Sequence, residues 1–261
     1  MSDHILVERA DGIATVTINR PKMRNAVSLA MWTAIGEETQ ALAKDDSVRA
    51  IVFRGAGTDA FASGADISEF KENRKDTETA LHYNKQTEIA YRSIRNCPKP
   101  TVAMIFGYCM GGAMALAMAC DLRFAAEGSK FGIPAARLSI IYGLDPVHQL
   151  VDLVGPAYAK DILYSARTVE ADEALRIGFI QRLVPAAQLE AHTLDYLGKV
   201  ASNAPLSIRG TKAQVRAIFE GITDQHRSHL AELGLETFNS QDYKEGTTAF
   251  LEKRAPRFQG R

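Results

Sequence analysis

The sequence contains few cysteines and no arrangement of residues that would bind a metal. Its 261 residues include three cysteines, Cys97, Cys109 and Cys120. They form no CxxC pair, and none lies beside a histidine at the spacing of metal ligands. An odd number of cysteines in an ordinary globular composition argues against a disulfide framework and predicts reduced thiols. We therefore expect a cytoplasmic protein without a metal site.

The chain also lacks an excess of charge of either sign. Its 31 basic residues balance 31 acidic ones, so that the formal net charge at pH 7 is zero, and no long run of one sign occurs. A protein that binds nucleic acid needs a stripe of basic side chains to neutralise the phosphates. We therefore expect no nucleic-acid partner, and RNA binding is the least favoured of the function classes considered below.

No hydrophobic run is long enough and pure enough to predict a membrane span. The most apolar stretch, from Thr101 to Ala119, contains Gly107, Gly111 and Gly112 and lacks the flanks of such a span. It is better explained by a buried strand that runs into a buried helix, so we expect no membrane partner. The length is near the upper limit for one core, which favours one main domain with a helical extension.

Apolar patterns predict strands in the first half of the chain and helices in the second. Residues 13–18 alternate threonine with valine or isoleucine, as a half-buried strand does. Residues 50–53 and 101–106 are short apolar runs that end at glycine and indicate buried strands. From Asp145 onward the pattern is helical, apart from residues 180–184. This order predicts an α/β protein with an α-helical C-terminal part.

A helix is also expected over residues 28–44, early in the chain. Ser28 is a suitable N-cap, because its hydroxyl can accept a hydrogen bond from an amide of the first turn. Trp32, Ile35 and Leu42 then fall near one face of this helix.

Two segments of small residues carry most of the functional information. They are FASGADISEF at residues 61–70 and GYCMGGAMALAMACD at residues 107–121. Each precedes a helix-forming run, and each offers free backbone N–H groups at the positive end of a helix dipole. Two such ends can hold one developing oxyanion between them.

In these two motifs the chain resembles the enoyl-CoA hydratase/isomerase family, the crotonase superfamily. That family builds the oxyanion hole for a thioester from two backbone N–H groups, and the resemblance implies that Ala65 and Gly112 supply them here. The resemblance covers nearly the whole chain. Further similar segments are INRPKMRNAVS at 18–28, KFGIPAARL at 130–138, ARTVEADEALRIGFIQRLVP at 166–185 and EGTTAFLEKRAPRF at 245–258.

The resemblance implies a fold and an assembly. We expect an α/β fold with a crotonase-like spiral of ββα turns over residues 1–200. An α-helical trimerisation part would follow over residues 201–261, and the two would form a single functional unit. The expected assembly is a homotrimer or a dimer of trimers.

The resemblance also implies which residues bind CoA, which is expected only as part of an acyl-CoA substrate and with no further cofactor. These residues are Lys22, Met23, Arg24, Ala26, Ser63, Ala65, Asp66, Ile67, Phe250 and Lys253. Lys22 and Arg24 would meet the phosphates, while Phe250 and Lys253 would lie near the adenine nucleotide. Two alternatives stay open. The side chain of Asp66 could be a catalytic acid or, as we favour, cap a helix start. Phe250 and Lys253 could lie on a free amphipathic helix.

The chain departs from the hydratases of this family at two positions. Where those enzymes carry the glutamates that flank the added water, this sequence has Ala115 and Ala135. Alanine can neither donate nor accept a proton, and each general acid–base group typically contributes about 10²- to 10⁴-fold in rate. We therefore expect hydration to be weak.

Tyr142 is a third candidate catalytic residue. A phenol donates a hydrogen bond without being ionised, and the chain resembles the family's methylmalonyl-CoA decarboxylases in having a tyrosine here. It departs from them at Ala65, where they carry histidine.

Arg137 could contact a substrate carboxylate or form a surface salt bridge. Asp145 is the nearest acidic residue, but the family's isomerases that carry an aspartate in this segment have it two positions earlier.

Three function classes remain open from the sequence. The favoured one is an enzyme that stabilises the enolate of an acyl-CoA thioester, as a lyase or isomerase of the family. Within this class, decarboxylation of a 2-carboxyacyl-CoA with the help of Tyr142 is the alternative to weak hydration. The other classes are a non-catalytic protein that binds CoA thioesters, and RNA binding.

Overall fold

The strands of the protein form two sheets. The computed structural model describes residues 4–261. The larger sheet has the order β1-β2-β3-β5-β7-β10 and the smaller one the order β4-β6-β8-β9. The strands are β1 (Ile5–Ala10), β2 (Ile13–Ile18), β3 (Ala50–Gly55), β4 (Ala60–Ala62), β5 (Thr101–Ile105), β6 (Tyr108–Met110), β7 (Leu122–Ala126), β8 (Lys130–Gly132), β9 (Val169–Glu170) and β10 (Arg182–Val184).

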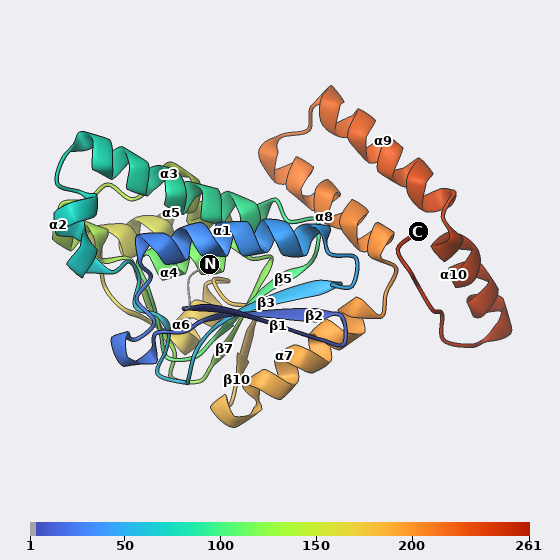
Figure 1. Cartoon of the computed structure of the whole chain (residues 1–261), viewed down its shortest axis with the longest axis horizontal. Coiled ribbons are helices and arrows are strands. Elements are labelled where there is room, and N and C mark those ends of the chain that lie inside the picture. Colours follow the sequence, from blue (N-terminus) through green and yellow to red (C-terminus); the bar gives the residue numbers. More distant parts are fainter. Residues whose placement is uncertain (1–3) are drawn as a thin grey trace.

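Helices cover both faces of the larger sheet. They are α1 (Leu29–Lys44), α2 (Phe70–Asn73), α3 (Thr77–Arg95), α4 (Gly112–Ala119), α5 (Leu144–Ser165), α6 (Ala171–Arg176), α7 (Ala186–Ala201), α8 (Pro205–Glu220), α9 (Asp224–Phe238) and α10 (Gln241–Glu252). Figure 1 shows α1 and α3 together above the sheet, with α7 below it. The sheet is therefore buried on both sides, which explains why its central strands are mostly apolar.

Successive strands alternate between the two sheets in a repeated ββα unit. β3 joins the larger sheet and β4 the smaller one, and the pairs β5/β6 and β7/β8 repeat this alternation. Within each sheet the equivalent strands are parallel. The pairs are followed by α3, α4 and α5 respectively. This confirms the expected α/β spiral, whose repeat is not visible in the sequence.

The strand β2 and the helix α1 lie where the sequence places them. β2 spans residues 13–18 as expected, and Ser28 caps α1 by accepting a hydrogen bond from the Met31 amide at 3.3 Å. Trp32, Ile35 and Leu42 are fully buried under this helix. The sequence did not predict β1, β7 or α3, nor the strands of two or three residues that build the smaller sheet.

The C-terminal helices extend away from the spiral. The division expected at residue 200 lies one residue before the end of α7, and α8 to α10 then occupy one end of the molecule, on the right of Figure 1. These helices expose large apolar side chains, namely Val215, Ile218, Phe219, Leu235, Phe238, Phe250 and Leu251. None of the helices within residues 4–261 has the length and apolar character needed to cross a bilayer.

A buried arginine fixes the far end of α4, the short helix that begins at Gly112. The guanidinium of Arg123 donates to the carbonyls of Ala117 and Cys120 at 3.3 and 2.9 Å, and to the carbonyl of Phe179 at 2.7 Å. A cation at this end of a helix complements the helix dipole. The sequence did not single out this residue, because most of its partners are backbone carbonyls.

Candidate active site

A cavity of about 420 Å³ lies where the two glycine-containing motifs meet. Its lining comes from both motifs, from α3 and from the segment that joins β8 to α5. The lining residues are Trp32, Ser63, Gly64, Ala65, Ile67, Phe70, Arg74, Tyr83, Asn84, Thr87, Glu88, Tyr91, Gly111, Gly112, Ala115, Ile133, Pro134, Ala135, Leu138, Ile140, Ile141, Tyr142, Gly143, Leu144, Asp145 and Pro146.

Glycine allows the two motifs to approach closely. Gly64 adopts φ +105°, and a Cβ at this position would lie 2.8 Å from the Met110 carbonyl oxygen and 3.6 Å from the Gly112 amide nitrogen. Any side chain here would push the motifs apart. Gly64 thus brings the loop before Ala65 against the start of α4.

The amides of Ala65 and Gly112 are both free to bind a ligand. Val27 and Asp66 form the backbone hydrogen bonds on either side of Ala65, and neither the Ala65 nor the Gly112 amide donates to any acceptor in residues 4–261. Gly112 is the first residue of α4, where an amide has no partner within the helix. The structure therefore places two unpaired N–H groups side by side in the lining of one cavity.

Three tyrosines surround these amides, and two of them hydrogen-bond to the backbone at the start of α4. The Tyr142 hydroxyl donates to the Gly111 carbonyl at 2.8 Å, and the Tyr91 hydroxyl donates to the Gly112 carbonyl at 3.3 Å. Burial raises the pKa of Tyr83, Tyr91 and Tyr142 above that of a free phenol. All three are therefore neutral near pH 7 and can donate but not abstract a proton.

Sequence reasoning did not identify Trp32, Tyr83 or Tyr91 as residues of this site. The Trp32 indole nitrogen donates to the Tyr83 hydroxyl at 3.1 Å, and its ring lies beside Gly112. Tyr91 contacts the Trp32 ring edge to face, with centroids 5.3 Å apart. These side chains come from α1 and α3. Trp32 falls on a helix face that in the sequence indicates only packing, whereas Tyr83 lies in a polar segment that gives no indication of a role.

The two alanines that replace glutamates both line the cavity. Ala115 is buried and Ala135 is half-buried. The lining contains two carboxylates, Glu88 and Asp145, and both pair with Arg92, at 2.9 and 3.3 Å. Within the described residues, each carboxylate of the cavity lining therefore already has an arginine partner.

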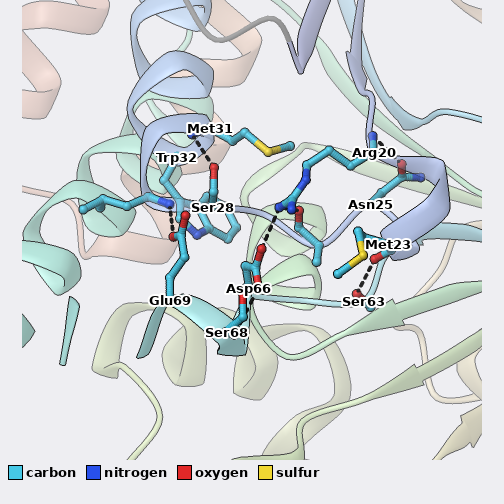
Figure 2. A network of polar contacts seen from close by, with 12 residues as sticks. Arg20, Met23, Asn25, Ser28, Met31, Trp32, Ser63, Asp66, Ser68 and Glu69 are labelled. Atoms are coloured by element: carbon cyan, nitrogen blue, oxygen red, sulfur yellow. Dashed lines mark hydrogen bonds and ion pairs between the residues drawn. The ribbon is translucent and has the colours of Figure 1, made fainter. Parts of the chain in front are cut away.

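The loop at residues 20–28 lies against the loop that carries Ala65. Figure 2 shows Arg20 reaching Asp66, with Nη1 2.8 Å from the carboxylate, and Ser63 beside Met23. The Ser63 amide also donates to the Arg24 carbonyl at 2.9 Å. These contacts bring together the two loops that were expected to bind CoA.

The carboxylate of Asp66 has a structural role. It is 7% exposed and accepts hydrogen bonds from the Ser68 amide and hydroxyl in addition to Arg20. The Ser68 hydroxyl, followed by Arg20, holds the pKa of Asp66 below its ordinary value. The expectation that this side chain caps a helix start is confirmed, and the carboxylate is not part of the cavity lining.

The other residues expected to bind CoA occupy different environments. Lys22, Met23 and Arg24 are exposed, whereas Ala26 is buried and Ile67 lines the cavity. Neither cation forms an ion pair with any residue from 4 to 261, although Arg24 stacks over the Tyr108 ring at 5.2 Å.

Two of the expected residues lie far from the cavity of their own chain. Phe250 and Lys253 belong to α10 and its C-cap, at the opposite end of the long axis from α2 and the outer end of α3 (Figure 1). Phe250 is 85% exposed. Arg137 is also exposed and outside the cavity lining.

No cluster in residues 4–261 has the three histidine, cysteine or acidic side chains that would hold a metal ion. The three cysteines are buried and unpaired with one another. Burial raises the pKa of both Cys109 and Cys120. These thiols are therefore protonated at neutral pH and pack as small apolar side chains.

Comparisons with known proteins agree with this geometry. The family model for enoyl-CoA hydratase/isomerase matches residues 8–261. The chain is 35% identical over 256 residues to a crotonyl-CoA hydratase of Syntrophomonas wolfei, covering 98% of each protein. It is 32% identical over 252 residues to a short-chain-enoyl-CoA hydratase of Clostridium acetobutylicum, covering 97% of this chain and 96% of that one.

A solved structure shares both the fold and the sequence pattern. An enoyl-CoA hydratase/carnithine racemase from Magnetospirillum magneticum superimposes with a TM-score of 0.94 at 35% identity, covering 100% of this chain and 97% of that one. The chain therefore belongs to the enoyl-CoA hydratase/isomerase family of acyl-CoA enzymes.

Proposed function

We propose that the protein binds an acyl-CoA thioester in the cavity and stabilises its enolate with the amides of Ala65 and Gly112. The observation that carries this proposal is the pair of unpaired amides beside each other in one cavity. Donors fixed in this way stabilise charge that develops in the transition state, and each is worth about 2.7–4 kcal/mol. CoA takes part only as a portion of the substrate.

Hydration is expected to be a weak activity of this site. Adding water to an enoyl-CoA requires a base to activate the water and an acid to protonate the α-carbon. The cavity offers alanine at positions 115 and 135, and its two carboxylates pair with Arg92. The phenols hold their protons near pH 7, because burial raises their pKa values, so they can donate a hydrogen bond but are not ionised to act as bases.

Decarboxylation of a 2-carboxyacyl-CoA is the second candidate reaction, because it needs no base. The breaking C–C bond leaves its electron pair on the thioester as an enolate, CO₂ departs, and the α-carbon then takes a proton from a phenol or from water. The apolar side chains of Ala115 and Ala135 favour this reaction, since a carboxylate held against them is poorly solvated.

The role first considered for Tyr142 is revised in this proposal. A tyrosine that orients a substrate carboxylate would need its hydroxyl proton for that contact. The Tyr142 proton is instead directed to the Gly111 carbonyl at 2.8 Å. We therefore assign Tyr142 to positioning the oxyanion hole rather than to binding the carboxylate.

CoA would lie along the two joined loops, with its phosphates near Lys22 and Arg24. Both cations are exposed and without an ion pair in the described part of the chain, and thus available to a phosphate. Phe250 and Lys253 lie on α10 and its C-cap, at the opposite end of the long axis from α2, which favours contact with the CoA of a neighbouring subunit.

Binding of CoA by Phe250 and Lys253 of a neighbouring subunit would require an oligomer, for which we propose a trimer or a dimer of trimers. The apolar side chains exposed on α8 to α10 form the kind of surface that an interface between subunits covers.

A turnover assay beside a binding titration tests the function. Crotonyl-CoA hydration and methylmalonyl-CoA decarboxylation are measured with the full chain, and butyryl-CoA binding is measured by calorimetry. Turnover of either substrate, if it depends on Gly112, supports the proposal that the protein is an enzyme. Binding without turnover of any acyl-CoA in a wider panel would indicate the non-catalytic alternative, and failure to bind any thioester would refute the proposal.

A further inference from the structure

Arg74 lines the cavity with a side chain that has no polar partner. Its guanidinium lies over the ring of Phe70, 4.4 Å from the centroid, and over the ring of Tyr83, at 4.7 Å. Its Nε is buried without an acceptor, and within residues 4–261 the side chain forms neither an ion pair nor a hydrogen bond. Buried donors are almost always paired, so an acceptor on a ligand is expected at this position.

None of the acidic side chains in the described residues pairs with Arg74. The two carboxylates of the cavity lining pair with Arg92, as described above. Asp66 is held by Arg20 at 2.8 Å, and Glu69 accepts a hydrogen bond from the Leu29 amide at 2.8 Å. Arg74 is thus the one charged side chain of the lining that none of the described residues neutralises.

The geometry of the stacked guanidinium indicates what it would bind. The Phe70 and Tyr83 rings lie on adjacent sides of the guanidinium, with their centroids 6.0 Å apart, and the N–H groups of the guanidinium have no acceptor in the described residues. A carboxylate matches the in-plane donors of a guanidinium with two parallel hydrogen bonds, and hydrogen bonds between charged groups are about twice as strong as neutral ones. A neutral acyl chain would leave the donors unpaired.

Arg74 lies beyond two aromatic residues when viewed from the oxyanion hole. The Trp32 ring is next to Gly112, the Trp32 indole nitrogen donates to the Tyr83 hydroxyl, and Arg74 stacks on the Tyr83 ring. A group bound to Arg74 is therefore separated from the thioester carbonyl by the width of these side chains. It corresponds to the far end of an acyl chain and not to a substituent on the α-carbon.

We propose that Arg74 binds a carboxylate at the distal end of the acyl group, which makes the preferred substrate class the CoA monothioester of a dicarboxylic acid. The inference rests on the proposed function, because the acyl chain of a CoA thioester must occupy the cavity. It applies directly to hydration, since the distal carboxylate takes no part in the bond changes; a substrate for decarboxylation would carry its 2-carboxylate in addition to the distal one.

The test compares thioesters that differ only at the far end of the chain. Binding of glutaryl-CoA and pentanoyl-CoA is measured by calorimetry, and likewise of adipyl-CoA and hexanoyl-CoA, so that each pair has equal carbon number. We expect the acidic member of at least one pair to bind roughly tenfold to a hundredfold more tightly. Arg74→Gln should abolish this preference and leave the affinity for the neutral member nearly unchanged.

Two further variants make the test specific. Arg74→Lys keeps the charge but not the planar donors, and should lose most of the preference; it also serves if Arg74→Gln does not fold. Lys71→Gln removes an exposed cation of α2 outside the cavity and should preserve the preference.

Equal affinities within both pairs, or a preference that survives Arg74→Gln, would overturn the inference while leaving the proposed function intact. If neither the neutral nor the acidic thioesters bind, the proposed function is wrong and this inference with it.

Discussion

The hydroxyl of Tyr142 hydrogen-bonds to the carbonyl of Gly111, which belongs to the same peptide group as the Gly112 amide. The Gly111 carbonyl also accepts the Met114 amide at 2.9 Å, so that peptide group is held from two directions. A hydrogen bond to the carbonyl fixes the plane of the peptide and strengthens its N–H as a donor. Tyr142 is therefore a positioning residue for the oxyanion hole.

Replacing Tyr142 with phenylalanine should lower kcat without raising KM. The phenylalanine ring fills the same space, and loss of a net hydrogen bond of about 0.5–1.5 kcal/mol corresponds to a decrease of up to roughly tenfold. Steady-state kinetics on the best acyl-CoA substrate measure the effect, whichever reaction it undergoes.

The matched control for this change is Tyr91→Phe. Tyr91 donates to the next carbonyl, that of Gly112, whose peptide group contains the Ala113 amide and not an amide of the hole. It should therefore change kcat less than Tyr142→Phe does. An unchanged kcat in Tyr142→Phe, or a larger effect of Tyr91→Phe, would contradict the positioning role.

The Gly112 amide itself can be removed by proline. Proline is tolerated at the first position of a helix, where Gly112 lies, but it has no N–H to donate. Loss of one donor of an oxyanion hole should lower kcat by about 10²- to 10³-fold. Turnover is measured after circular dichroism has shown that the variant is folded.

The variant Gly112→Ala separates the effect of losing the amide N–H from the effect of adding side-chain atoms at this position. A Cβ at this position approaches Trp32 and Tyr91 at 3.2 Å in either variant, but alanine keeps the N–H. We expect Gly112→Ala to retain most of the activity that Gly112→Pro loses. Wild-type kcat in a folded Gly112→Pro variant would show that Gly112 is not a donor of the hole.

Restoring both acid–base groups should raise hydration. Wild-type protein should hydrate crotonyl-CoA slowly, because each missing group costs about 10²- to 10⁴-fold. The double variant Ala115→Glu/Ala135→Glu should hydrate it at least about 10²-fold faster, and the Ala115→Gln/Ala135→Gln variant of similar size should not. A wild-type kcat/KM near the diffusional ceiling of about 10⁸ M⁻¹s⁻¹ would disprove the expectation.

The sequence was sufficient to predict the parts of the site that local motifs define. Small residues and their order indicated where Ala65 and Gly112 lie, and the polar side chain of Ser28 indicated the start of α1. The strands of the smaller sheet escaped prediction because two or three residues are too short to show a periodicity.

The aromatic wall could not be predicted for a different reason. Trp32, Tyr83 and Tyr91 lie on helices distant in sequence, and only tertiary packing brings them to Gly112. Arg74 follows the short helix α2 in a polar stretch with several charges, where nothing distinguishes it from its neighbours. Its place in the cavity depends on how Phe70 and Tyr83 pack.

The Asp66 carboxylate should make the stability depend on pH in acid. Its pKa is lower in the folded protein than in the unfolded chain, so the folded state binds fewer protons in this range. Its contribution is therefore complete well above pH 4 and is lost as the pH falls through the folded pKa. Asp66→Asn should reduce the unfolding free energy by about 1–3 kcal/mol at pH 7.

Urea unfolding of wild-type protein and Asp66→Asn at pH 7 and at acid pH measures this dependence. The difference between the two should shrink below about pH 4. Glu88→Gln, which alters a half-exposed carboxylate, should have little effect at either pH. A difference that is constant with pH would contradict the ionised Arg20–Asp66 pair as its origin.

Phe250 and Lys253 give a test of assembly and of the CoA site together. Light scattering should give at least three times the chain mass of 28.5 kDa, and a mass of one chain at micromolar concentration would rule out the oligomer.

If Phe250 and Lys253 serve a neighbouring subunit, a Phe250→Ala/Lys253→Ala variant and a Gly112→Pro variant should each be impaired alone. Refolded together, they should regain part of the activity, because some sites then combine an intact hole from one chain with an intact α10 from another. Separately refolded variants mixed afterwards are the control. No recovery in mixed oligomers of confirmed composition would show that the two residues do not complete a neighbour's site.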